Sequence, residues 1–407
     1  MEQSGSIKKI MLAYSGGLDT SAMLHWLKKT YKCPVVAFVA DVGQEDDFEE
    51  IRQKALATGA EECIVSDLKD EFVSEFIYPA IQAHSIYEDA YLLGTSLARP
   101  PIARAQVLAA KECGADCLAH GSTGKGNDQV RFELTYQALA PEIKILAPWR
   151  LWNFTSRSDL IEYSHQNAIP ITSTLEKPYS IDQNLMHTSY EGGILEDTWN
   201  LAPKDIFLTT VDPLKAPDDP EILRLEFSKG LPASLDGVSL APTDLIRELN
   251  TRAGKHGVGR VDLVENRFVG MKSRGVYETP GVTVLHEAHR ALESLVLDRE
   301  VQHLKDRLGN ELATKIYNGF WFAPETQLLL SAIAQTQASV TGEVEIQLFK
   351  GSCTVLRKRS QESIYDPDYA TFESDTVYNQ ADAGGFIRLQ GLRLRMGGKK
   401  KEARILE

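Results

Sequence analysis

The sequence lacks the features that mark several large classes of protein. It has no apolar run long enough to span a bilayer, and its N-terminus, MEQSGSIKK, is too polar for the hydrophobic region of a signal peptide. Its 57 acidic residues outnumber its 44 Lys and Arg residues, which gives a formal net charge of −13. Because binding to a phosphate backbone needs a dense basic face, this charge argues against an obligate nucleic-acid partner. We therefore expect a cytoplasmic protein that acts without nucleic acid or a membrane.

Metal-binding and redox motifs are also missing. The five cysteines are scattered and show no C-x-x-C spacing, so we expect them to be reduced and mostly buried. His286 and His289 invite a zinc interpretation, but the metalloprotease motif needs histidines four positions apart, and residue 290 is Arg. We interpret both histidines as ordinary helix residues.

The most informative stretch is Lys8–Lys29, KKIMLAYSGGLDTSAMLHWLKK. A short apolar run, a turn with two glycines and apolar residues at helical spacing predict a strand, a turn and a helix. Adjacent glycines let the backbone approach a ligand, and the first turn of a helix offers free N–H groups. Ser15, Thr20 and Ser21 add hydroxyl donors, and Asp19 suits a magnesium ion carried by phosphates. The turn therefore predicts a phosphate site, against the alternative that it merely joins a strand to a helix.

Two common nucleotide motifs do not occur in this turn. It has neither the G-x-x-x-x-G-K-[ST] spacing nor G-x-G-x-x-G, so neither a Walker-type NTPase nor a dinucleotide fold is indicated. The pattern S-G-G-x-D-[ST] instead resembles the pyrophosphate loop of the ATP pyrophosphatases. Those enzymes split ATP between the α and β phosphates by adenylating a substrate.

The first half of the chain alternates predicted strands with predicted helices. The strands are expected at 34–41, 63–65, 116–120 and 144–148, and the helices at 46–58, 71–83, 102–113, from 129 onward and at 159–167. This order predicts an α/β domain whose parallel sheet carries helices on both faces. Ligands of such sheets lie beyond the carboxyl ends of the strands, where the Ser15 loop, Ala40 and Gly121 would meet.

A second polar loop follows the strand predicted at 116–120. Residues 121–133, GSTGKGNDQVRFE, interleave three glycines with charged and amide side chains, which no core requires. We interpret this loop as substrate-binding. Upstream, Tyr91–Pro101 places hydroxyls where a helix begins, although Ser96 can equally serve only as an N-cap.

The second half of the chain has a different pattern. Strands are expected at 221–227, around 261–271, and as a hairpin at 343–349 and 353–358, and helices at 243–253, 283–317 and 325–337. This mixture predicts an α+β domain. Lys177–Met186 and Ser189–Gly193 are polar and suit a binding rim better than a core. From Asn379, apolar residues recur at helical spacing opposite arginines, which predicts an exposed amphipathic helix that needs a covering surface.

Four segments together point to one family: Ala13–Ser21, Tyr91–Pro100, Gly121–Glu133 and Lys177–Gly193. In their order and spacing the chain resembles the argininosuccinate synthase family over nearly its whole length. The resemblance implies an N-terminal nucleotide-binding domain of the adenine nucleotide α-hydrolase type at residues 1–170. It further implies a synthetase domain at 171–375 and a C-terminal oligomerisation helix at 376–407.

The resemblance also implies an activity. The family consists of carbon–nitrogen ligases of arginine biosynthesis, which join citrulline to aspartate with ATP and Mg²⁺ and release AMP and pyrophosphate. The reaction passes through a citrullyl-adenylate, and the family's C-terminal segment reaches onto neighbouring subunits of a homotetramer. We therefore expect citrulline, aspartate and ATP as small-molecule partners of a homotetramer.

Substrate contacts follow from the same resemblance, residue by residue. Those of ATP are Ala13, Tyr14, Ser15, Gly16, Gly17, Leu18, Asp19, Thr20, Ser21, Ala40 and Gly121. Those of citrulline are Tyr91, Ser96, Asn127, Arg131, Ser180, Ser189, Glu265 and Tyr277, and those of aspartate are Thr123, Asn127 and Asp128. Arg131 can hold a carboxylate through a bidentate pair, and Glu265 or Asp128 can accept from an ammonium group. The pattern alone would make Glu265 a surface residue, and it identifies no general base for the aspartate amine.

Three other functions fit the nucleotide loop less well. A tRNA-sulfurating enzyme acts on nucleic acid with catalytic cysteines, which the acidic charge and the scattered cysteines disfavour. A glutamine-dependent amide ligase needs a glutaminase domain with a Cys and His pair, which no segment offers convincingly. A non-catalytic nucleotide sensor has no use for the amino-acid contacts at Thr123, Asn127, Asp128 and Arg131. We therefore favour the synthase.

Overall fold

The chain forms two compact units. The structure, a computed structural model, describes residues 7–170, 179–373 and 377–405, with side chains described as far as residue 398. The larger unit is Met1–Glu362 and the smaller is Ser363–Glu407. Lys177 and Pro178, at the start of the predicted binding rim, lie outside the described residues.

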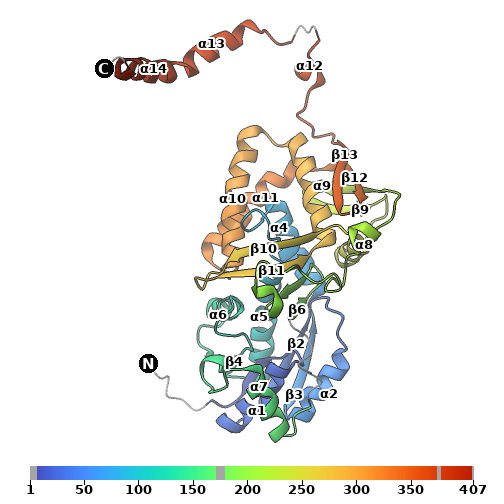
Figure 1. The fold of residues 1–407 in the computed structure, drawn as a ribbon, viewed down its shortest axis with the longest axis vertical. Coiled ribbons are helices and arrows are strands. Elements are labelled where there is room, and N and C mark those ends of the chain that lie inside the picture. The colour runs from blue at the N-terminus through green and yellow to red at the C-terminus, as the bar shows by residue number, and fades with distance from the viewer. Residues whose placement is uncertain (1–6, 171–178, 374–376, 406–407) are drawn as a thin grey trace. The chain divides into compact units, whose positions relative to one another are not determined.

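A parallel sheet of five strands begins the larger unit (Figure 1). Its strands are β1 (Ile10–Ala13), β2 (Val35–Asp41), β3 (Glu62–Asp67), β4 (Cys117–Ala119) and β5 (Lys144–Leu146). They are arranged in the order β3-β2-β1-β4-β5, and each neighbouring pair is parallel. Both faces are buried, because alternate residues of β1 enter different cores, Met11 on one side and Ile10 and Leu12 on the other.

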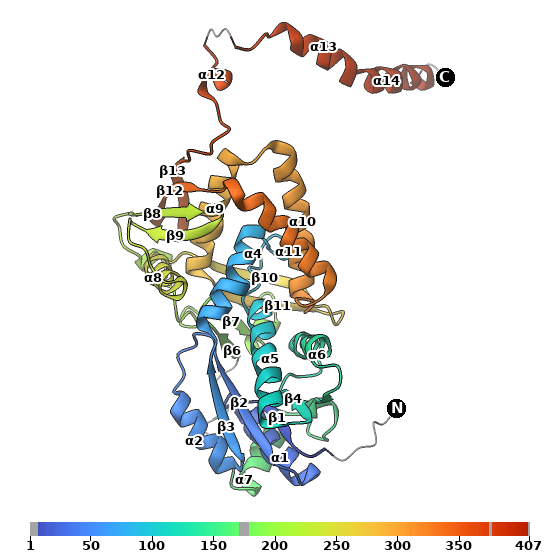
Figure 2. The ribbon, with the colours of Figure 1, turned by 180° about the vertical axis from the view of Figure 1, so that it is seen from behind.

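Helices cover both faces of this sheet, as Figures 1 and 2 show from opposite sides. The helices in this part of the chain are α1 (Leu18–Tyr31), α2 (Phe48–Thr58), α3 (Lys69–Glu71), α4 (Tyr78–Ala83), α5 (Gly94–Cys113), α6 (Asp128–Leu139) and α7 (Arg157–Gln166), of which α4 packs against α10 and α11. Residues of α1, α2 and α7 pack into one core, and residues of α5 and α6 pack into the other. The predicted doubly covered α/β domain is confirmed.

Helix α5 starts earlier than the helix predicted at 102–113. It begins at Gly94 and continues through Pro100 and Pro101, which are buried inside it. Proline lacks an N–H group, so these two positions cannot make the usual backbone bonds to the preceding turn. The helix persists because Leu97, Ala98 and Ala103 pack into the core on that face of the sheet. Ser96 therefore lies inside the helix and is not its N-cap, which is Leu93.

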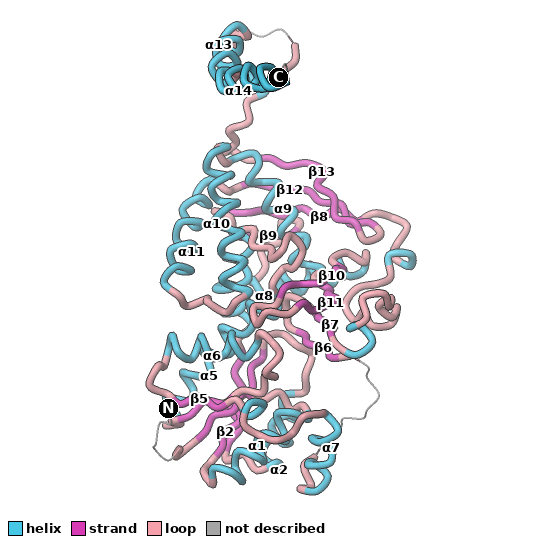
Figure 3. The backbone as a smooth tube through the Cα atoms, turned by 60° about the vertical axis from the view of Figure 1, so that its left-hand side comes forward, coloured by secondary structure: helices cyan, strands magenta, loops and turns pink. Residues whose placement is uncertain are grey.

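Two antiparallel sheets of four strands complete the larger unit (Figure 3). One, in the order β10-β11-β7-β6, contains β6 (Ser180–Gln183), β7 (Thr188–Glu191), β10 (Arg260–Asn266) and β11 (Lys272–Glu278). The other, in the order β13-β12-β8-β9, contains β8 (Glu221–Ser228), β9 (Leu231–Leu235), β12 (Gly342–Phe349) and β13 (Ser352–Arg359). The segments interpreted as a polar rim are thus strands β6 and β7.

Four helices accompany these sheets: α8 (Pro242–Lys255), α9 (Pro280–Val296), α10 (Arg299–Tyr317) and α11 (Pro324–Thr336). The single helical pattern predicted at 283–317 is divided between α9 and α10. The break occurs at Asp298, whose side chain accepts from the N–H of Glu300 and so caps α10. The core on the α5 side of the parallel sheet continues into this α+β region, which is why residues up to 362 form one unit.

The smaller unit is helical. It contains α12 (Pro367–Ala370), α13 (Ala381–Gln390) and α14 (Leu392–Ile405), which confirms the helical tail predicted from Asn379. Its large apolar side chains are exposed, among them Phe386, Leu389, Leu392 and Met396. None of the helices in the described ranges is long and apolar enough to cross a membrane.

Candidate active site

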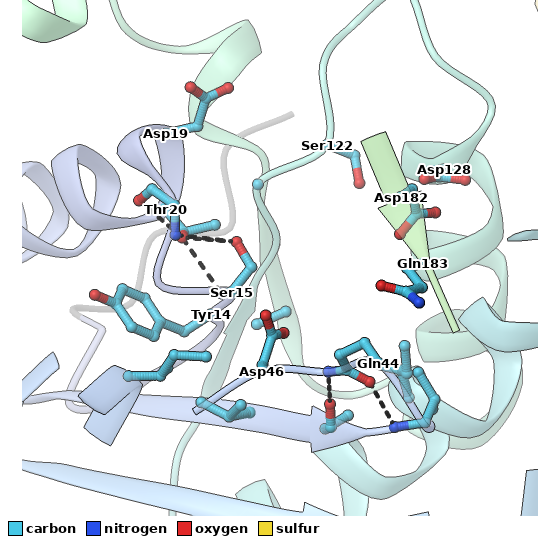
Figure 4. Close-up of a pocket in the computed structure, with 18 of the residues that line it drawn as sticks. Tyr14, Ser15, Asp19, Thr20, Gln44, Asp46, Ser122, Asp128, Asp182 and Gln183 are labelled. Carbon is cyan, nitrogen blue, oxygen red and sulfur yellow. Dashed lines mark hydrogen bonds between the residues drawn. The ribbon is translucent and has the colours of Figure 1, made fainter. Parts of the chain in front are cut away.

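The turn between β1 and α1 forms the first half of the site. Gly16 has a φ of +74°, which favours glycine, and Gly17 caps α1 without a side-chain hydrogen bond. The N–H groups of the first turn therefore have no partner within the helix. The hydroxyl oxygens of Ser15 and Thr20 lie 3.2 Å apart at this point, as Figure 4 shows. Free N–H groups at a helix start beside two hydroxyl groups are the features that a phosphate-binding turn requires.

Lys54 is a component of the turn that the sequence pattern did not reveal. Its Nζ atom, from α2, donates to the carbonyl of Gly16 at 2.6 Å. Burial lowers the pKa of Lys54. The hydrogen bond from Lys54 to Gly16 holds the turn in place. It also brings the amine of Lys54 next to the place where phosphates would bind.

The phosphate turn faces a cavity of about 780 Å³ at the carboxyl ends of the parallel strands. Its lining includes eight predicted ATP contacts together with Gly121: Ala13, Tyr14, Ser15, Gly17, Leu18, Asp19, Thr20 and Ala40. In Figure 4, Ser15 and Thr20 lie on one side of this cavity, and Ser122, Asp128 and Asp182 lie on the opposite side. A side chain at Gly121 would crowd the phosphate turn, because a Cβ atom there would lie 2.8 Å from the Thr20 methyl group.

The carboxylates of this cavity fit magnesium only together with a nucleotide. Burial raises the pKa of Asp19, with Arg157 acting in the opposite direction, and burial also raises the pKa of Asp46. Nowhere in the described residues do three His, Cys, Asp or Glu side chains gather as a metal site. Magnesium in nucleotide sites is bound by one or two carboxylates plus phosphate oxygens, and Asp19 and Asp46 both line this cavity.

A second cavity, of about 250 Å³, lies between α5, α6 and the sheet that contains β7, β10 and β11. It gathers most of the predicted amino-acid contacts: Tyr91, Thr123, Asn127, Asp128, Arg131, Ser189, Glu265 and Tyr277. These residues come from positions 91 to 277, so the cavity exists only when both halves of the larger unit are folded.

Asp128 is the best-anchored carboxylate in this second cavity. Its Oδ2 atom accepts from Nε of Arg99 at 2.9 Å, and its Oδ1 atom accepts from Nη1 of Arg131 at 2.8 Å. Burial alone would raise the pKa of Asp128, but the two arginines outweigh burial and hold it below the ordinary value. Asp128 is therefore ionised and able to accept from an ammonium group.

Glu265, unlike Asp128, is a buried carboxylate that lacks a full set of hydrogen-bond partners within the described ranges and has a raised pKa. It is buried, and its Oε1 atom accepts from the hydroxyl of Tyr277 at 3.0 Å, whereas Oε2 has no hydrogen-bond partner among the described residues. Burial raises the pKa of Glu265. An unpaired carboxylate oxygen in an enclosed cavity is costly unless a ligand supplies a donor. Glu265 and Tyr277 are thus part of a cavity wall, although the pattern alone would make them surface residues.

The two cavities share one wall. Arg99, Gly121, Ser122, Asp128 and Asp182 line both of them. Nη2 of Arg99 donates to Asp182 at 2.6 Å, so a guanidinium group and two carboxylates stand at the junction. A phosphate held by the first cavity and an amino acid held by the second would meet there.

Four predicted contacts do not line the cavity expected for them, and one of these is Gly16, which lines neither cavity. Ser180 lines the first cavity and not the second, although the resemblance assigns it to citrulline. Ser21 is buried with its hydroxyl 2.9 Å from that of Tyr14. Ser96 is fully buried in α5, where its hydroxyl has no partner within the described part of the chain.

His286 and His289 are buried side by side on α9, away from both cavities. Nε2 of His289 donates to the amide oxygen of Gln337 at 2.8 Å, and Nδ1 of His286 lies 3.3 Å from Nδ1 of His84. They are helix residues, as the sequence suggested, but they belong to the core.

Together these features define the class of the protein. A parallel sheet whose first turn is built for phosphates, joined to a charged cavity of amino-acid size, is typical of an enzyme that couples a nucleotide to a small polar substrate. The sequence model of the argininosuccinate synthase N-terminal HUP domain matches residues 9–170, and that of the C-terminal domain matches residues 179–397.

Named relatives agree with these matches. Argininosuccinate synthase of Desulfatibacillum aliphaticivorans is 55% identical over 390 residues, which cover 96% of this chain and 98% of that protein. The same enzyme from Syntrophus aciditrophicus is 54% identical, with 97% of this chain and 99% of that protein covered. The chain belongs to the argininosuccinate synthase family, which is a family of ligases. A solved U34-tRNA thiolase from Methanococcus maripaludis is 15% identical over 44% of this chain and 62% of that one, with a TM-score of 0.27, which is too weak to bear on function.

Proposed function

We propose that the chain joins citrulline to aspartate at the expense of ATP, forming argininosuccinate, AMP and pyrophosphate. The observation that carries this proposal is the wall shared by the phosphate cavity and the amino-acid cavity. An adenylating enzyme needs the α-phosphorus of ATP next to the oxygen that attacks it, and this wall is the place where the two can meet.

The first step would form the citrullyl-adenylate. The ureido oxygen of citrulline is a weak nucleophile, so the site has to hold it in line with the α-phosphorus and stabilise the charge that develops on pyrophosphate. The hydroxyls of Ser15 and Thr20 and the N–H groups at the start of α1 are placed for the second task. Arg99 adds positive charge at the junction.

The second step would release AMP. After the ammonium group of aspartate has lost a proton to solvent, its nitrogen forms a bond to the activated ureido carbon, and the bond from that carbon to the AMP oxygen breaks. Because adenylation has supplied a good leaving group, this chain has only to place the amine beside the carbon. Asp128, which is ionised and faces the cavity, is suited to orient the ammonium group before attack.

We propose the substrate contacts that the family resemblance implies. For ATP these are residues 13–21 with Ala40 and Gly121, and for aspartate they are Thr123, Asn127 and Asp128. For citrulline they are Tyr91, Ser96, Asn127, Arg131, Ser180, Ser189, Glu265 and Tyr277. Support comes from the lining of the two cavities, which contains most of them. When bound, Mg²⁺ would neutralise phosphate charge, with Asp19 and Asp46 as its protein ligands.

We also propose a cytoplasmic homotetramer. The apolar residues exposed on α13 and α14 support association, because such a face is normally covered. The five free cysteines are compatible with a reducing compartment. We keep the domains 1–170, 171–375 and 376–407 as a proposal, and the family match that ends at residue 170 supports the first of these boundaries.

Product analysis tests the proposal. Purified protein is incubated with ATP, magnesium, citrulline and aspartate, and then with each substrate omitted in turn, while AMP is resolved from ADP. We expect AMP, pyrophosphate and argininosuccinate only when both amino acids are present. ATP that binds but yields no AMP would support a nucleotide sensor, and AMP that needs neither amino acid would indicate another acceptor.

A further inference from the structure

The amino-acid cavity is rich in paired charges. Its lining contains the guanidinium groups of Arg99, Arg131 and Arg267 and the carboxylates of Asp128, Asp182, Glu191 and Glu265. Aspartate would bring two more carboxylates into this space, and burying them requires cationic partners. The contacts assigned to aspartate by resemblance, Thr123, Asn127 and Asp128, include no cation.

Two of the three arginines are already committed to the protein. Arg131 donates from Nε and Nη2 to the carbonyl oxygen of Tyr317, at 3.0 and 2.9 Å, and from Nη1 to Asp128. Arg99 connects Asp128 to Asp182 at the wall shared with the phosphate cavity. Their positions suit the citrulline end and the phosphate junction, respectively.

Arg267 is placed differently. It follows β10 and touches the glycine-rich loop after β4, because its Nη1 atom donates to the carbonyl of Lys125 at 3.3 Å. The N–H of Val269, in the same turn, donates to the side-chain oxygen of Asn127 at 3.4 Å. Arg267 therefore contacts the loop to which aspartate is assigned and, unlike Arg99 and Arg131, it does so without pairing with Asp128.

The partner of Arg267 is a carboxylate whose side chain is about half exposed to solvent. Nη2 of Arg267 donates to Oε2 of Glu191 at 2.6 Å. Burial raises the pKa of Glu191, and the nearby carboxylates of Asp128, Glu265 and Asp182 raise it further, whereas Arg267 lowers it. Glu191 ends β7 and Arg267 directly follows β10, and β11 lies between these two strands and pairs with both of them.

We propose that Arg267 binds a carboxylate of aspartate in exchange for Glu191 and thereby makes the enzyme selective for a dicarboxylic amine acceptor. This inference rests on the proposed function. A guanidinium group takes a carboxylate through two parallel hydrogen bonds, and its present contacts use only part of its donor fork. Glu191 is about half exposed, so its carboxylate can be hydrated by solvent once it is released.

The test compares Arg267→Gln with Lys272→Gln, which removes an exposed cation from the same hairpin outside both cavities. Initial rates of AMP formation are measured while aspartate, citrulline and ATP are varied separately. Arg267→Gln should raise the Michaelis constant for aspartate about 10- to 100-fold, which is the effect of losing hydrogen bonds to a charged group. The constants for citrulline and ATP should change by less than about twofold. Lys272→Gln should leave all three unchanged.

Acceptor selectivity provides a second measurement. In the unmodified enzyme we expect a strong preference for aspartate over asparagine, measured as a ratio of kcat/KM values. The preference should fall in Arg267→Gln and recover in part in Arg267→Lys, which keeps the charge but loses the fork. If Arg267→Gln fails to fold, the test uses Arg267→Lys instead. We then compare its Michaelis constant for aspartate and its ratio of kcat/KM for aspartate to kcat/KM for asparagine with those of the unmodified enzyme.

Two results would overturn the inference. In Arg267→Gln, an equal rise in the Michaelis constants for aspartate and citrulline would mean that Arg267 only holds the loop through the Lys125 carbonyl. The same aspartate defect in Lys125→Gln, with Arg267→Gln unaffected, would make Lys125 the cation. Failure of the proposed function is distinguishable, because the unmodified protein would then form no AMP.

Discussion

Arg131 shows how one side chain can serve both the fold and the site. It is buried, its guanidinium group lies 5.1 Å from the centre of the Tyr317 ring, and the carbonyl of Tyr317 accepts two of its hydrogen bonds. The same group lines the amino-acid cavity. It is therefore held in position before a ligand binds, which lowers the entropic cost of binding.

Replacement of Arg131 should affect citrulline most. We expect Arg131→Ala to raise the Michaelis constant for citrulline by about tenfold or more, because a charge-assisted contact is lost. The constant for ATP should change little, since Arg131 lines only the second of the two cavities. Steady-state kinetics with each substrate varied would check this, and equal effects on citrulline and ATP would contradict it.

A buried histidine should make stability depend on pH. Burial lowers the pKa of His289 from its ordinary value of 6.5 to about 4, with Glu293 opposing and Lys305 reinforcing this shift. Between these pH values the unfolded chain binds more protons than the folded chain. The contribution of neutral His289 to the free energy of unfolding is therefore complete above pH 6.5 and is lost as the pH falls toward 4. The loss amounts to about 3 kcal/mol at most.

Denaturant unfolding between pH 4 and 7 measures that dependence. His289→Gln should flatten the fall in the free energy of unfolding, because Gln does not titrate in this range. His303→Gln, at an exposed position on α10, is the matched control and should keep the original slope. A slope unchanged by His289→Gln would mean that other groups determine the acid sensitivity.

At the residue scale, the sequence predicted local features of the site but not its long-range pairs. The phosphate turn and the 121–133 loop are each contained in one short stretch, so their glycines and hydroxyls can be recognised there. The pair of Arg267 with Glu191 depends on where β11 lies against β7 and β10. No local pattern encodes that register. The charged residues Glu191 and Arg267, in segments with little apolar character, were nevertheless a signal that a charged site is formed there.

Two elements of the fold cross unusually closely. Gly309 on α10 lies against the end of α4, where an added Cβ atom would be 2.1 Å from the carbonyl oxygen of Ala83. Because that neighbour is backbone, it cannot rotate away. We expect Gly309→Ala to reduce the free energy of unfolding by about 1–3 kcal/mol, even though Ala favours helix.

Thermal or denaturant unfolding would measure the effect of Gly309→Ala. Asn310→Ala is a suitable control, because it alters the next, exposed position of the same helix. A Gly309→Ala protein as stable as the control would show that the two helices can separate at little cost.

Elements with strong hydrophobic patterns were predictable, and those with polar sequences were not. Val35–Asp41 is apolar almost throughout and forms the buried strand β2. Ser180–Gln183 and Thr188–Glu191 are short and polar, and they become β6 and β7 only by pairing with each other and, for β7, with β11. The break between α9 and α10 was also missed, although Asp298 directly before Arg299-Glu300 is a recognisable cap.

At the scale of the whole molecule, the two units should be separable. The larger unit has its own continuous cores, whereas the smaller exposes its large apolar side chains. We expect a chain that ends at Glu362 to keep a cooperative unfolding transition but to form a smaller assembly than the full chain. Light scattering coupled to gel filtration would measure the assembly, and a tetramer formed without residues 363–407 would contradict the proposed role of the C-terminal helices.

The hydrogen bonds from Arg131 to the carbonyl of Tyr317 join residues that are 186 positions apart. A ribosome delivers the five strands of the parallel sheet, and with them the phosphate turn, well before it delivers Tyr317. A chain interrupted soon after β5 has the phosphate turn but lacks Ser180–Gln183 and Leu208, which line the first cavity. It also lacks Glu265 and Tyr277, which line the second. Neither cavity is complete in such a product, so ligation must wait for the later residues.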